Sequence, residues 1–352
     1  MSEYYDGTKL LSMKDKNGDV PEIYMCTSNR TAGKTTYFNR LAVNRFLSGR
    51  GKFALLYRFN YELDNVADKF FKDIGGLFFP KYSMRSERRS SGIYHELFLV
   101  NNQAYDDDGV SCGYAITLNS ADQIKKLSHL FSDVEMILFD EFQSETNKYC
   151  ADELTKFKSV HTSIARGQGK QYRYVPVYMM SNPISIINPY YVDMGISDRL
   201  RSDTKFLRGT GFVLEQGYVE TASKAQHDSA FNRAFQNDEY LLYSSECVYL
   251  NDNTAFIDKP EGTGHYIATI KYMNYEFGLR EYAGQGIIYC DNRPDRTYPF
   301  KIAITTDDHQ INYVMLKKND AFRASMRYYF ERGCFRFKDL RCKEALLKLV
   351  SY

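Results

Sequence analysis

The sequence predicts an α/β fold: a domain built on a parallel sheet, followed by a smaller α/β domain. Over the first 200 residues, short apolar segments alternate with amphipathic helical segments, which is typical of parallel strands joined by helices. From residue 238 onward strand-like segments dominate, and two helical stretches close the chain. Residues 201–237 mix charged, Gly and small polar residues without a clear period. We therefore expect a first domain at 1–200, a linker at 201–237 and a second domain at 238–352.

The chain opens with the pattern strand, loop, helix, strand, helix. Residues 21–27 (PEIYMCT) are short and apolar, as in a buried strand. Residues 34–48 carry apolar side chains at three- and four-residue spacings and are followed by Gly49, so they predict a helix. Residues 52–59 and 62–74 repeat the strand and the helix.

The segments that follow complete both domains. Apolar runs on either side of the turn YDDDG predict a β-hairpin over 93–118 at the edge of the sheet, and the basic, Ser-rich run 85–92 before it is expected to be a mobile loop. The rest of the first domain is expected as a helix, a strand, a helix and a strand at 120–131, 134–139, 152–166 and 173–180. In the second domain we expect strands within 239–250, 265–282, 284–291 and 300–306, and helices at 317–331 and 338–350.

Composition narrows the class of protein. The chain has 352 residues, a net charge of +2 and seven Cys without a CxxC pair. An odd number of scattered Cys indicates reduced thiols in a cytoplasmic compartment rather than a disulfide scaffold. No stretch approaches about 18 consecutive apolar residues, and the first residues lack the apolar core of a signal peptide. We therefore expect no membrane partner.

The loop between the first strand and the first helix matches a phosphate-binding motif. Its sequence, SNRTAGKT, fits the P-loop pattern GxxxxGK[ST] except at Ser28, where a small residue replaces Gly. Such a loop turns its backbone N–H groups onto phosphates at a helix N-terminus. Lys34 is expected to reach the β- and γ-phosphates, and the hydroxyl of Thr35 to ligate Mg²⁺. The predicted ATP-binding residues are Ser28, Asn29, Arg30, Thr31, Ala32, Gly33, Lys34, Thr35 and Thr36.

A second motif follows the apolar strand MILF. The strand ends in Asp140-Glu141, the arrangement of a Walker B motif. Asp140 is predicted to hold Mg²⁺, and Glu141 to orient and polarise the attacking water. Solvated acids after a strand are common, so Asp140-Glu141 alone would be weak evidence for a Walker B motif. The P-loop earlier in the chain is what makes this interpretation specific.

Two further residues fit a hydrolase. Asn182 follows the strand at 173–180, where its amide is expected to reach the γ-phosphate or the attacking water, although an Asn that caps a turn before Pro is an equal alternative. Arg166 ends a helix before a Gly-rich loop, and we consider it as an arginine finger for a neighbouring subunit. The alternative is a solvated residue that complements the helix dipole.

Taken in order, these segments resemble the DNA-packaging ATPases of small tailed phages with protein-primed linear genomes, compact relatives of the terminase large subunits. The resemblance covers about residues 20–350 and rests on SNRTAGKTTYFNRLAVNRF, KFALLYRF, MILFDEFQSE, a helix ending in IAR, YMMSNPISIINPYY and IAITTDD. It implies a P-loop (ASCE-type) ATPase domain and a smaller RNase-H-like α/β domain.

The resemblance also implies partners and a location. The expected protein is a ring of identical subunits, typically five, on the portal (connector) vertex of an empty procapsid in the host cytoplasm. It would move double-stranded DNA inward with ATP and Mg²⁺, with or without a packaging RNA. Arg166 aligns with the residue expected to act in trans, and Arg30 is a second candidate sensor of the γ-phosphate. Asp291, Asp307 and Asp308 form an incomplete nuclease set, which implies a catalytically inactive docking domain.

Three alternatives remain open from the sequence. The first is a terminase-like protein with an active C-terminal nuclease. The second is a P-loop kinase of a small molecule, against which the Asp-Glu pair argues because it suits activation of water. The third is a non-catalytic nucleic-acid-binding or scaffold protein, against which the intact Lys34, Thr35, Asp140 and Glu141 argue.

Overall fold

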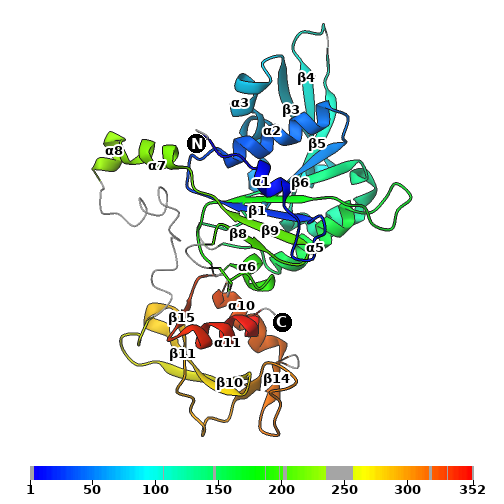
Figure 1. Ribbon diagram of the computed structural model, residues 1–352. Coiled ribbons are helices and arrows are strands. Elements are labelled where there is room, and N and C mark those ends of the chain that lie inside the picture. Colours follow the sequence, from blue (N-terminus) through cyan, green and yellow to red (C-terminus); the bar gives the residue numbers. More distant parts are fainter. Residues whose placement is uncertain are drawn as a thin grey trace. The chain divides into compact units, whose positions relative to one another are not determined.

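The computed structural model describes residues 4–105, 107–145, 148–186, 188–197, 199–200, 204–234, 257–316, 319–330 and 332–350. The chain divides into two compact units, each with its own sheet (Figure 1). The first unit comprises the described residues within 4–143, 149–183 and 204–234, and the second comprises those within 144–148, 184–200 and 257–350.

The sheet of the first unit has nine strands in the order β3-β4-β5-β2-β6-β7-β1-β9-β8. The six strands from β5 to β9 in this order run parallel, whereas β3, β4 and β8 pair antiparallel at the two edges. The predicted parallel sheet is therefore confirmed. The strands are β1 (Ile23–Thr27), β2 (Lys52–Tyr57), β3 (Tyr82–Arg89), β4 (Tyr94–Asn101), β5 (Val110–Thr117), β6 (Val134–Asp140), β7 (Val177–Ser181), β8 (Phe206–Arg208) and β9 (Phe212–Gln216).

The order of the central strands identifies the P-loop subclass. Strand β7 lies between β1, which precedes the predicted P-loop, and β6, which carries the predicted acids. One strand inserted at this place is the mark of the ASCE type, as expected. The parallel register pairs Thr27 with Ser181 and Asp140 with Met180. The carboxyl-terminal ends of β1, β6 and β7 therefore lie side by side.

Helices cover both faces of this sheet. One face packs against α2 and α3 through a core that includes Phe38, Phe70 and Leu138. The neighbouring Phe139 points to the opposite face, because side chains alternate along a strand, and there it stacks on Phe157 of α5. The helices are α1 (Thr8–Ser12), α2 (Lys34–Leu47), α3 (Val66–Phe78), α4 (Ala121–Lys126), α5 (Glu153–Ile164), α7 (Glu220–His227) and α8 (Ala230–Arg233), with short 3₁₀ turns at Asn60–Leu63, Ser90–Gly92, Leu118–Ser120 and Ser128–Phe131.

Two expectations about loops are wrong. Part of the predicted linker 201–237 forms β8, β9 and α7. Strand β9 pairs with β1 as the second strand from one edge of the sheet, and its residues Phe212, Val213 and Leu214 are buried. The run 85–92 is mostly strand β3, so the predicted hairpin β4–β5 is not the outermost pair. A strand at a sheet edge tolerates charge, since only one of its two sides is paired.

The second unit is a smaller α/β domain with a six-stranded mixed sheet, in the order β14-β13-β10-β11-β12-β15. Its apolar core contains Ile270, Leu279 and Ile288 of the sheet and Leu346 of the last helix. The predicted segment 239–250 lies outside the described residues. The elements are α6 (Pro189–Asp193), β10 (His265–Tyr272), β11 (Tyr275–Tyr282), a 3₁₀ turn (Ala283–Gln285), β12 (Ile287–Asp291), β13 (Lys301–Ala303), β14 (Val314–Met315), α10 (Asp320–Phe330), β15 (Phe335–Phe337) and α11 (Leu340–Val350).

Candidate nucleotide-binding site

The predicted P-loop connects β1 to α2, as its sequence context requires. Ser28 and Asn29 are fully buried, and the Ser28 N–H donates to the carbonyl of Ser181 (3.3 Å), which fixes the start of the loop on β7. Gly33 caps α2 with φ of 91°, a left-handed conformation that Gly adopts without strain. The first turn of α2 therefore presents its backbone N–H groups at the mouth of the loop, where an anion binds.

Lys34 is the buried cation of this site. Its side chain is 7% exposed, and Nζ donates to the carbonyl oxygens of Ser28 (3.2 Å) and Asn29 (3.5 Å). A shorter bond of 2.7 Å joins Nζ to Oδ1 of Asn182. The structure thus brings Asn182 to the P-loop lysine across 148 positions of sequence. Carbonyl and amide oxygens are partners that a charged ammonium takes, and a positive charge at this place suits a phosphate.

Thr35 and Asp140 meet beside it. The Thr35 hydroxyl donates to Oδ2 of Asp140 at 2.9 Å. Burial raises the pKa of the Asp140 carboxyl above its ordinary value, while the Lys34 ammonium and the Thr35 hydroxyl act in the opposite direction. A hydroxyl and a carboxylate are oxygen donors of the kind that Mg²⁺ takes, usually one or two from the protein with phosphates and waters completing the shell. These two groups fit that pattern.

Glu141 follows β6 in a conformation that is rare for its residue type. Its φ is 54°, in the left-handed region, and its side chain is exposed. The Glu141 N–H donates to Oδ1 of Asp140 (2.9 Å). The turn at Glu141 therefore ends the strand with a solvent-facing carboxylate one residue beyond Asp140.

Arg166 does not join this site. It is exposed directly after α5, and the next residues contact the segment before β6, since Nε2 of Gln168 donates to the carbonyl of Ser132 (2.9 Å). Asp140 lies at the other end of β6, and a strand of this length spans about 20 Å. Arg166 therefore lies near the amino-terminal ends of the parallel strands, whereas its own chain's P-loop lies at their carboxyl-terminal ends.

Several residues around the loop were not predicted. Asn29 forms two hydrogen bonds of 3.0 Å with the backbone of Val219, donating to its carbonyl and accepting from its N–H. Gln226 of α7 donates to the carbonyl of Arg30 (3.0 Å) and to the hydroxyl of Thr31 (3.0 Å). No local signal could have revealed these contacts, because about 190 residues separate the partners and the pairing of β9 with β1 brings them together.

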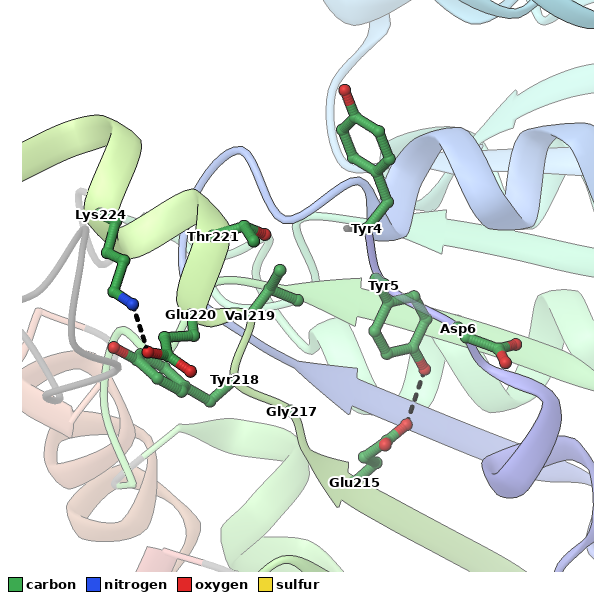
Figure 2. A pocket seen from close by; sticks show the side chains of 10 residues that line it. All are labelled: Tyr4, Tyr5, Asp6, Glu215, Gly217, Tyr218, Val219, Glu220, Thr221 and Lys224. Carbon is green, nitrogen blue, oxygen red and sulfur yellow. Dashed lines mark hydrogen bonds and ion pairs between the residues drawn. The ribbon is translucent and has the colours of Figure 1, made fainter. Parts of the chain in front are cut away.

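A pocket of about 570 Å³ adjoins the P-loop. Figure 2 shows Tyr4, Tyr5 and Asp6 of the N-terminal segment on one side and the segment from Glu215 to Lys224 on the other. The Tyr5 hydroxyl donates to Oε2 of Glu215 (2.7 Å), and burial raises the pKa of Glu215. The Tyr5 N–H donates to the carbonyl of Ala32 (2.8 Å), so the pocket is attached to the P-loop itself.

Within the described residues, no helix has the length and apolar character needed to cross a membrane. The same residues contain no group of three or more His, Cys, Asp or Glu side chains placed to hold a metal ion.

The fold and the loop at its sheet edge define an α/β protein of the P-loop class, ASCE type. The chain belongs to the family described as Podovirus DNA encapsidation protein (Gp16), whose model matches residues 1–351. It is 24% identical over 312 residues to the DNA packaging protein of Bacillus phage phi29, covering 88% of this chain and 87% of the relative. It is also 24% identical over 330 residues to the DNA packaging protein of Bacillus phage B103, covering 92% and 93%. The chain is therefore a viral DNA packaging protein.

Solved structures agree with this fold. A chain of the bacteriophage Phi-29 viral genome packaging motor assembly matches with a TM-score of 0.55 and 21% identity, over 99% of this chain and 100% of that one. The Phi-28 gp11 DNA packaging motor matches with a TM-score of 0.58 and 16% identity, over 100% and 97%. At these identities the likeness concerns the fold.

Proposed function

We propose that this protein is an ATP-driven motor that translocates viral double-stranded DNA into an empty procapsid through the portal. The observation that carries the proposal is the convergence of two hydrogen-bonded pairs at the N-terminus of α2, Lys34 with Asn182 and Thr35 with Asp140. Membership of a DNA encapsidation family supports DNA as the cargo.

The triphosphate of ATP binds in this proposal along residues 28–36. The N–H groups of the loop and of the first turn of α2 receive the phosphate oxygens, and Lys34 exchanges its carbonyl partners for the β- and γ-phosphates. Thr35 and Asp140 hold Mg²⁺, which neutralises charge on these phosphates. Glu141 is the carboxylate that orients the attacking water, and Asn182 lies beside Lys34 where the γ-phosphate ends.

The pocket between the N-terminal segment and α7 takes the nucleoside in this proposal. It is joined to the P-loop through Ala32 and Asn29, and Tyr4, Tyr5 and Tyr218 line it. Aromatic faces stack on a base, and Glu215 is an acceptor for an exocyclic amino group. The pocket and the phosphate loop together have the chemistry of one ATP site.

Replacing Tyr218 with Ala tests the pocket. Because stacking on one base contributes on the order of 1–3 kcal/mol, we expect Tyr218→Ala to raise the KM for ATP about tenfold and leave kcat at saturation within about twofold. Initial rates across ATP concentration measure this. Tyr328→Ala is the control, since Tyr328 is similarly exposed (54% against 53%) but lies in α10. An unchanged KM in Tyr218→Ala would exclude the base from this pocket.

The position of Arg166 supports an assembly in which each subunit contributes to the ATP site of its neighbour. An arginine at the sheet edge opposite to its own P-loop can serve only the site of another subunit, so catalysis through Arg166 requires a ring. Arg30, within the loop, is the remaining candidate sensor in cis. We further propose a homopentamer on the portal vertex in the host cytoplasm, with a packaging RNA as an optional partner. The likeness in fold to a chain from a viral genome packaging motor assembly supports assembly into a motor.

The second unit is proposed to be an RNase-H-like docking domain without nuclease activity. Five strands of its sheet support this, since they follow the order β12-β11-β10-β13-β14, three antiparallel strands and then two parallel ones, as in the RNase H fold. The sixth strand, β15, is added in parallel beside β12. Asp291 is paired with Arg280 (2.6 Å), and Asp308 accepts the N–H groups of Met273 (3.2 Å) and Asn274 (2.8 Å). These carboxylates therefore have structural partners.

We expect no nicking of supercoiled plasmid by the purified protein with Mg²⁺ or Mn²⁺, since two of the three acids of the predicted set, Asp291 and Asp308, are committed to Arg280 and to backbone N–H groups. Gel electrophoresis over a protein titration measures it, and Asp291→Asn is the matched variant. Nicking by the wild type that Asp291→Asn abolishes would establish instead the terminase-like protein with an active nuclease.

Steady-state ATP hydrolysis with and without long duplex DNA tests the proposed class directly. A motor hydrolyses ATP and is stimulated by DNA, whereas a small-molecule kinase stays idle without its acceptor and a scaffold stays idle throughout. Lys34→Ala controls for contaminating ATPases, because it removes the phosphate-binding ammonium. DNA-independent turnover that persists in Lys34→Ala would remove the support for the proposal.

A further inference from the structure

Arg58 is a buried arginine that forms hydrogen bonds with the backbone at Glu141. It directly follows β2 and is 5% exposed. Nη1 donates to the carbonyl oxygen of Glu141 (2.8 Å), and Nη2 donates to that of Phe142 (2.5 Å). The two ends of the guanidinium thus hold consecutive carbonyls at the point where the chain leaves β6.

Glu153 orients this arginine. It is the first residue of α5 and is 2% exposed, and both its oxygens lie 3.0 Å from Nε of Arg58. The Cys150 N–H donates to Oε2 of Glu153 (2.8 Å), and the Cys150 thiol donates to the carbonyl of Arg58 (3.2 Å). Separating Arg58 from Glu153 would leave an uncompensated charge in the interior, which is costly. The pair and its hydrogen bonds to Cys150 therefore hold the guanidinium in one place.

The same arrangement restricts Glu141. Residues in the left-handed region other than Gly are strained and persist only when their surroundings hold them. Here Asp140 accepts the Glu141 N–H at 2.9 Å, while Arg58 donates to the Glu141 carbonyl. Both polar backbone groups of Glu141 are therefore fixed, and its carboxylate remains exposed.

We propose that Arg58, oriented by Glu153, is a positioning residue for the carboxylate of Glu141. The inference rests on the proposed role of Glu141 in activating water. Arg58 acts through the backbone, and Glu153 neutralises its charge, so it is not a ligand of the phosphates. Because a shift of about 1 Å in a reacting group costs on the order of 100-fold in rate, a clamp on this backbone sets turnover without contributing to ATP binding.

A second buried arginine, Arg173, holds the other end of β6 and serves as a control for a purely structural role. Arg173 is also buried (6% exposed), and it holds the start of β6, donating from Nη1 to the Val134 carbonyl (3.1 Å) and to Oε1 of Glu135 (3.0 Å). Its Nη2 donates to the carbonyl of Ile164 (2.8 Å). Arg173 thus repeats the chemistry of Arg58 at the end of β6 away from Glu141.

The experiment compares Arg58→Lys with Arg173→Lys, because Lys keeps the charge but cannot hold two carbonyls and a carboxylate in one plane. We measure kcat and KM for ATP hydrolysis with saturating duplex DNA, binding of a fluorescent ATP analogue, and Tm. For Arg58→Lys we expect kcat to fall about 10- to 100-fold, with KM and analogue binding within about twofold of wild type. For Arg173→Lys we expect a comparable loss of Tm, so this variant measures what removing a buried arginine beside β6 costs in stability; its kcat is not compared, because Arg173 also holds the Ile164 carbonyl, two residues from Arg166.

Wild-type kcat in folded Arg58→Lys, or a loss of ATP-analogue binding as large as its loss of kcat, would overturn the inference. If Arg58→Lys does not fold, Glu153→Gln decides instead, since it retains the guanidinium and its volume: lower kcat at unchanged KM supports positioning, and wild-type kcat refutes it. Glu141→Gln in the same assay distinguishes failure of the proposed function from failure of the role of Arg58. Wild-type turnover by that variant contradicts the proposed function itself, whereas an inactive Glu141→Gln beside a fully active Arg58→Lys removes only the role of Arg58.

Discussion

Glu141→Gln should bind ATP and hydrolyse almost none of it. The amide keeps the size of the side chain and its exposed position after β6 but cannot accept a proton from water. General-base catalysis contributes about 10²- to 10⁴-fold, so kcat should fall at least about 100-fold. Binding should stay within about threefold, because the phosphate contacts in the proposed function come from Lys34 and the loop and not from Glu141. Steady-state turnover and binding of a fluorescent ATP analogue measure the two effects separately.

Glu145→Gln is the matched control for this variant. Glu145 is a second exposed glutamate four residues further along the chain, and its loss should leave kcat within about twofold. Equal turnover by Glu141→Gln and wild type would assign water activation to another group. Loss of ATP binding in Glu141→Gln would show instead that the substitution disturbs the P-loop.

Arg166→Ala should abolish turnover while leaving nucleotide binding intact. Arginine fingers contribute about 10³- to 10⁵-fold to phosphoryl transfer. Arg166 lies near the start of β6, a strand about 20 Å long that has Asp140 at its other end. The same assays apply, with Lys170→Ala as the control, since Lys170 is an exposed cation of the same loop. Weakened ATP binding in the isolated Arg166→Ala subunit would contradict an action in trans.

Mixing two inactive variants distinguishes action in trans from action in cis. A site that keeps Glu141 on an Arg166→Ala subunit becomes complete when its neighbour is a Glu141→Gln subunit that keeps Arg166. We therefore expect turnover to reappear in mixed rings and to peak at intermediate ratios. Inactivity at every ratio, under conditions in which wild-type and variant subunits exchange, would exclude Arg166 as the trans-acting residue.

The strand–loop–helix at Ser28–Thr35 and the acids after β6 could be predicted because their signals are local. Apolar runs mark the strands, Gly33 and Lys34 mark the loop, and the parallel sheet then places Asp140 at the same edge. The contact between Lys34 and Asn182 follows from the same rule, since β7 ends beside β1.

The pocket beside the P-loop and the contacts of Arg58 could not be predicted, because both depend on pairings between distant segments. Residues 212–214 are a short apolar run inside a polar stretch, and their burial beside β1 is what makes 212–216 a strand. Arg58 and Glu153 are 95 positions apart, and neither belongs to a motif. Strand β3 was missed for the opposite reason, since its charged side chains conceal a backbone that pairs along its whole length with β4.

The central claim, that ATP hydrolysis at this site drives DNA into a procapsid, is tested most directly by protection of DNA from nuclease. Purified protein, ATP, Mg²⁺, genome-length duplex DNA and portal-bearing procapsids of the same phage are combined, and DNA that survives DNase is quantified. We predict protected full-length DNA with the wild type and none with Glu141→Gln or a non-hydrolysable ATP analogue. Equal protection by the wild type and by Glu141→Gln would contradict the account.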